Sequence, residues 1–171
     1  VMAAKRVEIF AVGNYASVAQ DAQMKFLRLG IPCGVHTDPH LQQLVSKLVT
    51  RDTATLFISS GGNLPELMAL QQNISELGAP VIAITANQSL LAKKADAALV
   101  AEHNEHAATH LPMVSRVLHL LLIDILIVGL EMRHLTASAN TLDLEDRPHE
   151  VPASPGVRLA TPLKPYISHS Q

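Results

Sequence analysis

Two short stretches of small and polar residues have the composition of anion-binding loops. The first is SSGGN at residues 59–63, which follows an apolar run and precedes an expected helix start at Leu64-Pro65-Glu66. The second is GNYAS at residues 13–17, which follows another apolar run. Hydroxyl groups and free amide N–H groups at a helix start attract negative charge, and glycine lets the backbone approach a ligand closely. Both stretches are therefore candidate phosphate-binding loops.

The elements that would position these loops alternate between short β-rich runs and helical segments. Strands are expected at 7–12, 33–36, 54–59, 81–85 and 97–101. Helices are expected at about 16–29, 41–48, 64–77, 90–95 and 112–134. This alternation predicts an α/β fold, a three-layer α-β-α sandwich with a five-stranded parallel sheet. The central runs are apolar at nearly every position, which is typical of strands covered on both faces.

The first-choice strand order is the flavodoxin-like 2-1-3-4-5. In that order the topological switch lies between the first and third strands. The loops at 13–17 and 59–63 would then meet at the edge of the sheet where open α/β folds bind ligands. A tight turn with no ligand remains the alternative.

Composition narrows the class of protein. The chain has 171 residues, is 48% hydrophobic and 16% charged, and carries a net charge of −2, so no basic surface for nucleic acid is expected. Cys33 is the single cysteine, which excludes an internal disulfide and favours a reduced, cytoplasmic setting. No signal peptide is visible, and the most apolar run, 117–130, is too short to span a membrane.

The chain divides into two regions. Residues 1–136 are expected to form the folded domain. Residues 137–171 are expected to form a proline-rich tail without periodicity, containing Pro148, Pro152, Pro155, Pro162 and Pro165.

Four longer segments carry a resemblance to a known family. They read GNYASVAQDAQMKFLRLG, ISSGGNLPEL, GAPVIAITANQSLLAKKADAAL and LPMVSRVLHLLLIDILIVGL. Together, from about Arg6 to Arg133, they resemble the SIS (sugar isomerase) domain, particularly that of RpiR/HexR-like bacterial transcription regulators. The resemblance implies that a phosphorylated sugar or sugar acid is the effector, that no cofactor is needed, and that DNA is bound by a helix-turn-helix domain absent from this chain.

The resemblance also implies a set of ligand-binding residues. In the family, a serine after the first strand and an S-x-S/T-G-x-T-x-E loop after the third strand hold the phosphate. Carried over without gaps, Ser59, Gly62 and Glu66 match that loop, and Ser89 matches a family serine farther along. The full expected set is Gly13, Asn14, Tyr15, Ser17, Ser59, Ser60, Gly61, Gly62, Asn63, Glu66 and Ser89.

Three small hydroxyl residues of the family pattern are absent. Gly61 and Leu64 replace two in the second loop, and Tyr15 replaces the serine of the first loop, with Ser17 two residues later. A hydrogen bond to a charged group contributes about 1.5–3 kcal/mol. The hypothesis is that the phosphate loop is retained with an altered or weakened preference.

Two rival functions stay open. A stand-alone phosphosugar isomerase would use Glu66 with a histidine from EHNEHAATH at 102–110 as acid and base, whereas a degenerate domain would serve only for dimerisation. The histidines of that segment, His103, His106 and His110, lack a recognised metal-binding spacing, so no metal site is expected.

The helix expected at 112–134 is apolar almost all round, which indicates burial on more than one side. Because it follows the edge strand, we expect it to pack against a second subunit in a homodimer, with pairing into a tetramer left open.

Overall fold

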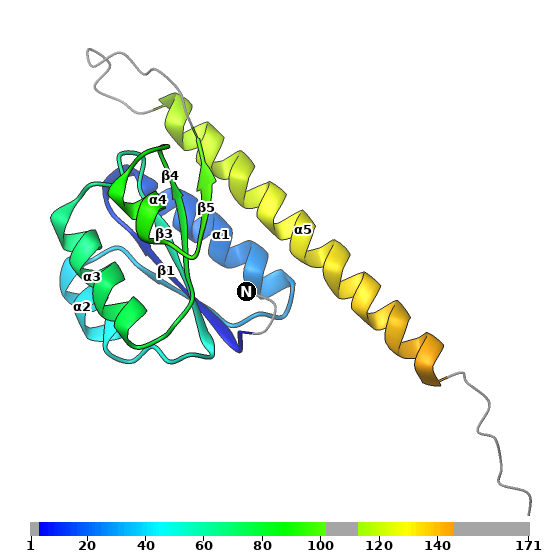
Figure 1. The fold of residues 1–171 in the computed structure, drawn as a ribbon. Coiled ribbons are helices and arrows are strands. Elements are labelled where there is room, and N and C mark those ends of the chain that lie inside the picture. The colour runs from blue at the N-terminus through cyan, green and yellow to red at the C-terminus, as the bar shows by residue number, and fades with distance from the viewer. Residues whose placement is uncertain (1–3, 102–112, 146–171) are drawn as a thin grey trace, which may run out of the picture.

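The computed structural model describes residues 4–101 and 113–145. Within them a single parallel sheet has the order β2-β1-β3-β4-β5, which confirms the predicted topology (Figure 1). The strands are β1 (Arg6–Ala11), β2 (Cys33–His36), β3 (Thr53–Ile58), β4 (Val81–Thr85) and β5 (Ala97–Val100).

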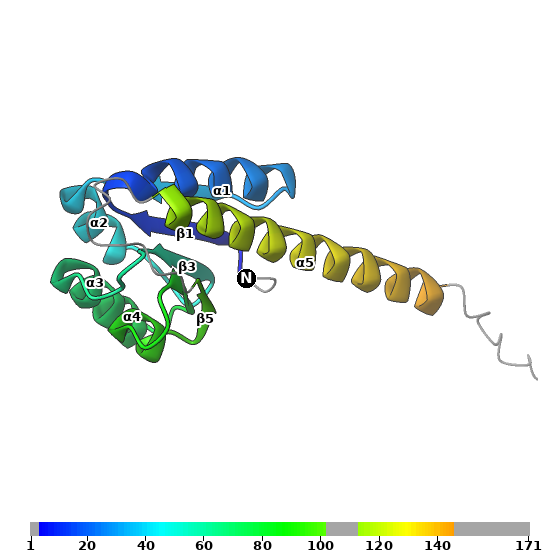
Figure 2. The ribbon, with the colours of Figure 1, turned by 90° about the horizontal axis from the view of Figure 1, so that it is seen from above.

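Helices cover both faces of this sheet, giving the predicted three layers. The helices are α1 (Ala16–Arg28), α2 (Pro39–Ser46), α3 (Pro65–Glu76), α4 (Leu90–Lys94) and α5 (Met113–Glu145), with a short 3₁₀ turn, η1, at Gly13–Tyr15. Figure 2 shows α1 and α5 side by side on one face, and α2, α3 and α4 on the other.

A hydrophobic core lies on each side of the sheet, which explains why the central strands are apolar at nearly every position. Ile9 and Leu56 belong to the cluster beneath α1 and α5. Phe10 and Phe57 belong to the cluster beneath α2, α3 and α4, where their rings stack with centroids 5.0 Å apart. All six residues of β3 are buried, as expected for a central strand covered on both faces.

Local sequence signals fix where the helices begin and end. The Asp38 carboxylate accepts hydrogen bonds from the first amides of α2, and Pro39 occupies the first helical turn. Gly30 and Gly78 follow α1 and α3 with φ angles of +75° and +76°, a conformation that glycine adopts without strain.

Helix α5 is longer than the sequence predicts. It continues to Glu145, beyond the expected end near 134, because residues 137–145 include good helix formers such as alanine, leucine and glutamate. Figure 1 shows its C-terminal half extending past the sheet. The division between a domain and a tail at residue 136 stays a prediction, because residues 146–171 lie outside the described residues.

The two faces of α5 differ. One face is buried on the sheet and α1 through Ser115, His119, Ile123 and Leu130. The opposite face exposes an apolar row, called here the α5 stripe: Val114, Val117, Leu121, Ile125, Val128, Met132 and Leu135. Among the residues that the structure describes, no helix is long and apolar enough to cross a bilayer.

Candidate functional site

The two candidate loops meet at one edge of the sheet. Strands β1 and β3 are neighbours, so the loops that follow them, 13–17 and 59–63, lie side by side at the carboxyl edge. Between them is an open cleft of about 330 Å³. It is lined by Val12, Asn14, Tyr15, Ser59, Ser60, Gly61, Gly62, Asn63 and Leu64.

The loop after β3 holds its own shape. The Gly62 amide donates a hydrogen bond to Ser59 Oγ at 3.2 Å. Gly62 has a φ of +59°, and a Cβ at this position would lie 2.2 Å from Thr85 Oγ1. Glycine is therefore required here both for its backbone conformation and for the close approach of the loop to the end of β4.

Further hydrogen bonds fasten this loop to the loop after β4. The amide of Leu91 donates to the Gly62 carbonyl at 3.0 Å, and the amide of Ala86 donates to the Ser60 carbonyl at 2.9 Å. The amide of Leu90 donates to Asn63 Oδ1, also at 3.0 Å. Because these contacts lie within the protein, the cleft is formed before a ligand arrives.

Several amide groups of the loop point to anion binding. Among the described residues, no acceptor takes a hydrogen bond from the amides of Ser60, Gly61, Asn63 or Leu64. They precede α3, a helix of 12 residues, whose N-terminus carries partial positive charge. Unpaired amides at a helix N-terminus are the arrangement that binds phosphate and carboxylate groups in many proteins.

Among the described residues, none with an acidic or basic side chain lines the cleft apart from Tyr15. The described groups that could hold an anion are therefore amides, hydroxyls and the N-terminus of α3. Glu66 lies in the first turn of α3 but is exposed and outside the cleft lining. Leu64 does not close the cleft, since 42% of its surface remains exposed.

The structure brings seven of the eleven predicted ligand-binding residues to this cleft. The other four are Gly13, Ser17, Glu66 and Ser89. Ser17 is exposed and its hydroxyl donates to the Asn14 carbonyl at 3.3 Å. Ser89 is buried and caps α4 by accepting a hydrogen bond from the Ala92 amide. Their roles in binding stay predictions.

Sequence reasoning gave no role to His119, which the structure places next to the site. Its ring lies 4.9 Å from that of Tyr15, centroid to centroid, at an angle of 48°. Tyr15 therefore turns its ring toward α5 and leaves the cleft open. The helical periodicity of the sequence could show that His119 lies on the same buried face as Ile123. It could not show that the His119 ring contacts Tyr15.

The segment containing His103, His106 and His110 lies outside the described residues. Within the described ranges, no group of three or more potential metal-binding side chains occurs.

A buried charge cluster lies away from the cleft. The carboxylate of Glu8 on β1 pairs with Arg6 and with His36 Nε2, the latter at 2.6 Å. Burial, with a further contribution from Glu8, raises the pKa of the Cys33 thiol to about 12. This thiol is therefore poorly suited to act as a nucleophile.

Comparison with protein families matches residues 2–129 to the SIS domain. Among curated relatives, the bifunctional protein glk of Paraburkholderia xenovorans is 39% identical over 82% of this chain and 22% of its own length. The HTH-type transcriptional regulator HexR of Escherichia coli is 34% identical over 76% of this chain and 45% of its own length. The chain thus spans about a fifth to a half of these relatives.

Solved structures show the same fold. The Vibrio vulnificus NanR protein, complexed with ManNAc-6P, aligns with a TM-score of 0.73 and 22% identity over 85% of this chain and 56% of that one. A Bacteroides fragilis protein involved in capsule formation, provisionally assigned as a phosphosugar isomerase, aligns with a TM-score of 0.68 and 26% identity over 76% of this chain and 70% of that one.

These similarities include both regulators and proteins assigned as isomerases, so they do not distinguish the two activities. The family itself is clear, because the match covers most of the chain and the fold agrees with it. The chain belongs to the SIS domain family.

Proposed function

We propose that this chain is the effector-sensing and dimerisation part of a sugar-responsive transcription regulator, and that its effector is a phosphorylated sugar or sugar acid. The observation that carries the proposal is the open cleft, together with four amides in the loop before α3 that have no hydrogen-bond acceptor among the described residues. Its volume of about 330 Å³ lies in the range of small-molecule sites. The similarity to HexR supports the regulatory role.

The chemistry of the cleft fits a phosphate at one end and a sugar at the other. The unpaired amides of the loop 59–63 would take the phosphate oxygens, and the Ser59 hydroxyl can donate a further hydrogen bond while it accepts one from Gly62. The side-chain amides of Asn14 and Asn63 lie where sugar hydroxyls could reach them.

Calorimetric titration tests this function directly. The probes are glucose 6-phosphate, 6-phosphogluconate, N-acetylmannosamine 6-phosphate and arabinose 5-phosphate, each compared with its unphosphorylated parent. We expect at least one phosphorylated probe to bind and its parent to bind far more weakly. Failure of all four to bind would favour a domain used only for dimerisation.

The isomerase remains the second candidate because a structural neighbour is assigned to that class. Against it, Glu66 lies outside the cleft lining and is exposed to solvent. Aldose–ketose conversion of the same four probes, followed by NMR, separates the two functions. Turnover that is lost in the Glu66→Gln variant would replace the regulatory proposal with the enzymatic one.

The α5 stripe supports self-association of the domain. Its residues recur at intervals of three and four along the helix, from Val114 to Leu135, so they form one continuous apolar face. Such faces in a protein of this size usually mark an interaction site. A second copy of the chain is the occupant that we propose, since a symmetric pair would bury both stripes at once.

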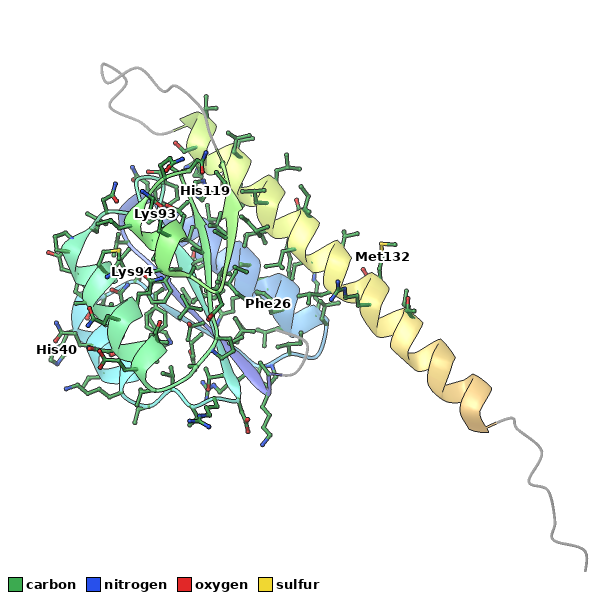
Figure 3. All side chains as sticks on the ribbon, viewed as in Figure 1. Phe26, His40, Lys93, Lys94, His119 and Met132 are labelled. Atoms are coloured by element: carbon green, nitrogen blue, oxygen red, sulfur yellow. The ribbon has the colours of Figure 1, made fainter. Side chains whose placement is uncertain are left out.

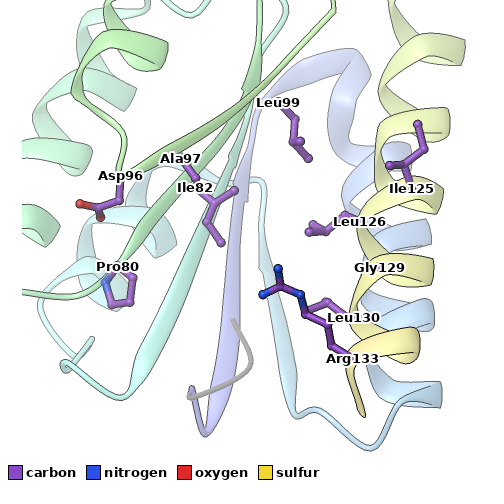
Figure 4. A pocket seen from close by; sticks show the side chains of 10 residues that line it. All are labelled: Pro80, Ile82, Asp96, Ala97, Leu99, Ile125, Leu126, Gly129, Leu130 and Arg133. Carbon is purple, nitrogen blue, oxygen red and sulfur yellow. The ribbon is translucent and has the colours of Figure 1, made fainter. Parts of the chain in front are cut away.

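A second cavity lies beside this helix. Figure 4 shows it between α5 and the β4–β5 end of the sheet, with Ile82 and Leu99 on one side and Ile125 and Leu126 on the other. Its volume is about 610 Å³ and its lining is mostly apolar. Ile125 belongs both to this cavity and to the α5 stripe, so the cavity adjoins the stripe.

Sedimentation equilibrium tests the dimer. Leu121→Glu and Ile125→Glu, both on the α5 stripe, are expected to shift the chain toward monomer by placing a charge in the interface. Leu48→Glu is the matched control, because Leu48 is also an exposed leucine but lies after α2. A wild-type monomer at micromolar concentration, or equal dissociation by the control, would contradict the proposed interface.

The remaining parts of the proposal concern the full-length protein. DNA would be contacted by a helix-turn-helix domain outside this chain, in the cytoplasm, and effector binding would change how two such domains are presented. This chain alone, with its net charge of −2, is not expected to bind DNA tightly.

A further inference from the structure

The residue that links the cleft to α5 is Tyr15. It ends the 3₁₀ turn η1, directly precedes α1, and lines the cleft. Its side chain is only 7% exposed and packs in the core that α1 shares with α5. No described residue lies within hydrogen-bonding distance of its hydroxyl, so packing alone fixes the ring.

The main aromatic neighbour of that ring is His119 on α5. The imidazole is fully buried, at 0% exposure. Its Nδ1–H donates to the Ser115 carbonyl at 2.6 Å, one turn earlier on the same helix. This bond restrains the rotation of the imidazole, whose ring lies against that of Tyr15. Figure 3 shows His119 on the buried side of α5, near the end of the molecule that carries the cleft.

We propose that His119 is a positioning residue of the anion cleft: its ring holds Tyr15, and through Tyr15 it holds the loop 13–17 in the conformation that leaves the cleft open. Loss of the His119 ring would leave a void against the Tyr15 ring, so that the ring and the loop 13–17 would lose this support. The inference rests on the proposed function only for the identity of the ligand. The effect on the loop can be measured without any ligand.

The first test is hydrogen–deuterium exchange of the ligand-free protein. His119→Ala should raise the exchange rate of the amides in residues 13–17, whereas His119→Phe should keep it near wild type because an aromatic ring is retained. Phe26→Leu is the control: Phe26 is fully buried in the same core but lies near the far end of α1. Unchanged exchange in His119→Ala, or an equal rise in Phe26→Leu, overturns the proposal.

The second test measures affinity for whichever of the four phosphorylated probes the wild-type protein binds. His119→Ala should weaken binding on the order of tenfold, corresponding to about 1.4 kcal/mol, and His119→Phe should restore most of it. If wild type binds and His119→Ala binds equally well, the positioning role fails while the proposed function stands. If wild type binds no probe, the proposed function fails and the exchange experiment alone decides the positioning role.

Should His119→Ala fail to fold, the same contact can be tested from the other side. Tyr15→Leu removes the ring that His119 touches and keeps an apolar side chain in the core. It should raise amide exchange in the same loop, and normal exchange there would count against the proposal.

Discussion

Ser59 Oγ accepts the amide proton of Gly62 over 3.2 Å, and this hydrogen bond closes the loop after β3 on itself. The hydroxyl proton of Ser59 remains able to point toward a ligand, because the oxygen serves here as acceptor. One serine thus both shapes the loop and can donate to an anion.

Replacing Ser59 by alanine should therefore weaken binding of a phosphorylated sugar. A lost hydrogen bond to a charged group costs about 1.5–3 kcal/mol, or roughly 10–150-fold in Kd. Calorimetric titration of Ser59→Ala checks this value. Ser75→Ala is the control, since Ser75 is an exposed serine at the other end of α3 and outside the cleft lining. Equal losses in the two variants would contradict a special role for Ser59.

The two glycines of the same loop should respond differently to substitution. A Cβ on Gly62 would lie 2.2 Å from Thr85 Oγ1 and 2.6 Å from Ser89 Oγ, and φ is +59°, so Gly62→Ala should destabilise the fold by about 1–3 kcal/mol. A Cβ on Gly61 would meet nothing within 4 Å. Thermal and denaturant unfolding of the two variants should separate them clearly. A stable Gly62→Ala variant would show that the loop can relax.

Because of Cys33, the free energy of unfolding should fall as the pH becomes alkaline. Burial first, and then Glu8, raise the pKa of its thiol from the ordinary value of 9.0 to about 12. The unfolded chain would lose this proton first, so the contribution of Cys33 is fully present below pH 9 and is lost as pH rises toward 12. Unfolding free energies of wild type and Cys33→Ala, measured from pH 8 to 11, should show a shallower decline in the variant.

The rate of alkylation of Cys33 gives a second test of the raised pKa of its thiol. Iodoacetamide reacts with the thiolate, so Cys33 in the folded protein should be alkylated much more slowly at pH 8.5 than in the denatured chain. Equal rates would mean that the thiol is not protected by its surroundings.

An ion pair between α1 and α5 should make a modest contribution to the free energy of unfolding. Lys25 on α1 pairs with Asp124 on α5. Within α1 it also pairs with Asp21, and the distance from Lys25 Nζ to Asp21 Oδ2 is 2.6 Å. Burial lowers the pKa of Lys25, but its hydrogen bonds to Asp124 and Asp21 outweigh burial and hold the pKa above its usual value. The stabilisation is therefore present below about pH 10.4 and is lost as pH rises above it.

Asp124→Asn should lower the unfolding free energy by less than about 1 kcal/mol at neutral pH, because Asp124 is more than half exposed. The loss should shrink at high salt. Glu131→Gln, an exposed carboxylate on the same helix for which no described ion pair exists, is the control. A salt-independent loss would indicate that Asp124 acts through packing.

The alternation of strands and helices predicts the parallel sheet. The flavodoxin-like order is the first choice for such a sheet, and the meeting of the two loops follows from that order. A fifth, weaker strand is expected at 97–101, and β5 spans Ala97–Val100. The direction in which a side chain points does not follow from this alternation. Tyr15 occupies the family's serine position, yet whether its ring enters the cleft or leaves it depends on α5, more than a hundred residues later.

For Ser89, too, the sequence gives the residue type but not the partner of its hydroxyl. The family pattern placed it among the ligand-binding residues, whereas in the fold its hydroxyl accepts from the Ala92 amide and lies 3.3 Å from Thr85 Oγ1. Capping of a short helix and contact with a ligand use the same chemical group. Only the structure shows that the Ser89 hydroxyl lies next to the Ala92 amide and Thr85 Oγ1.

The hydrogen bonds that fasten the loop after β3 to the loop after β4 run mostly between main-chain atoms. Because the main chain supplies most of these bonds, side chains on the rim of the cleft can differ while its outline is kept. Ser59 and Asn63 are the exceptions, since their side chains also hold the loop.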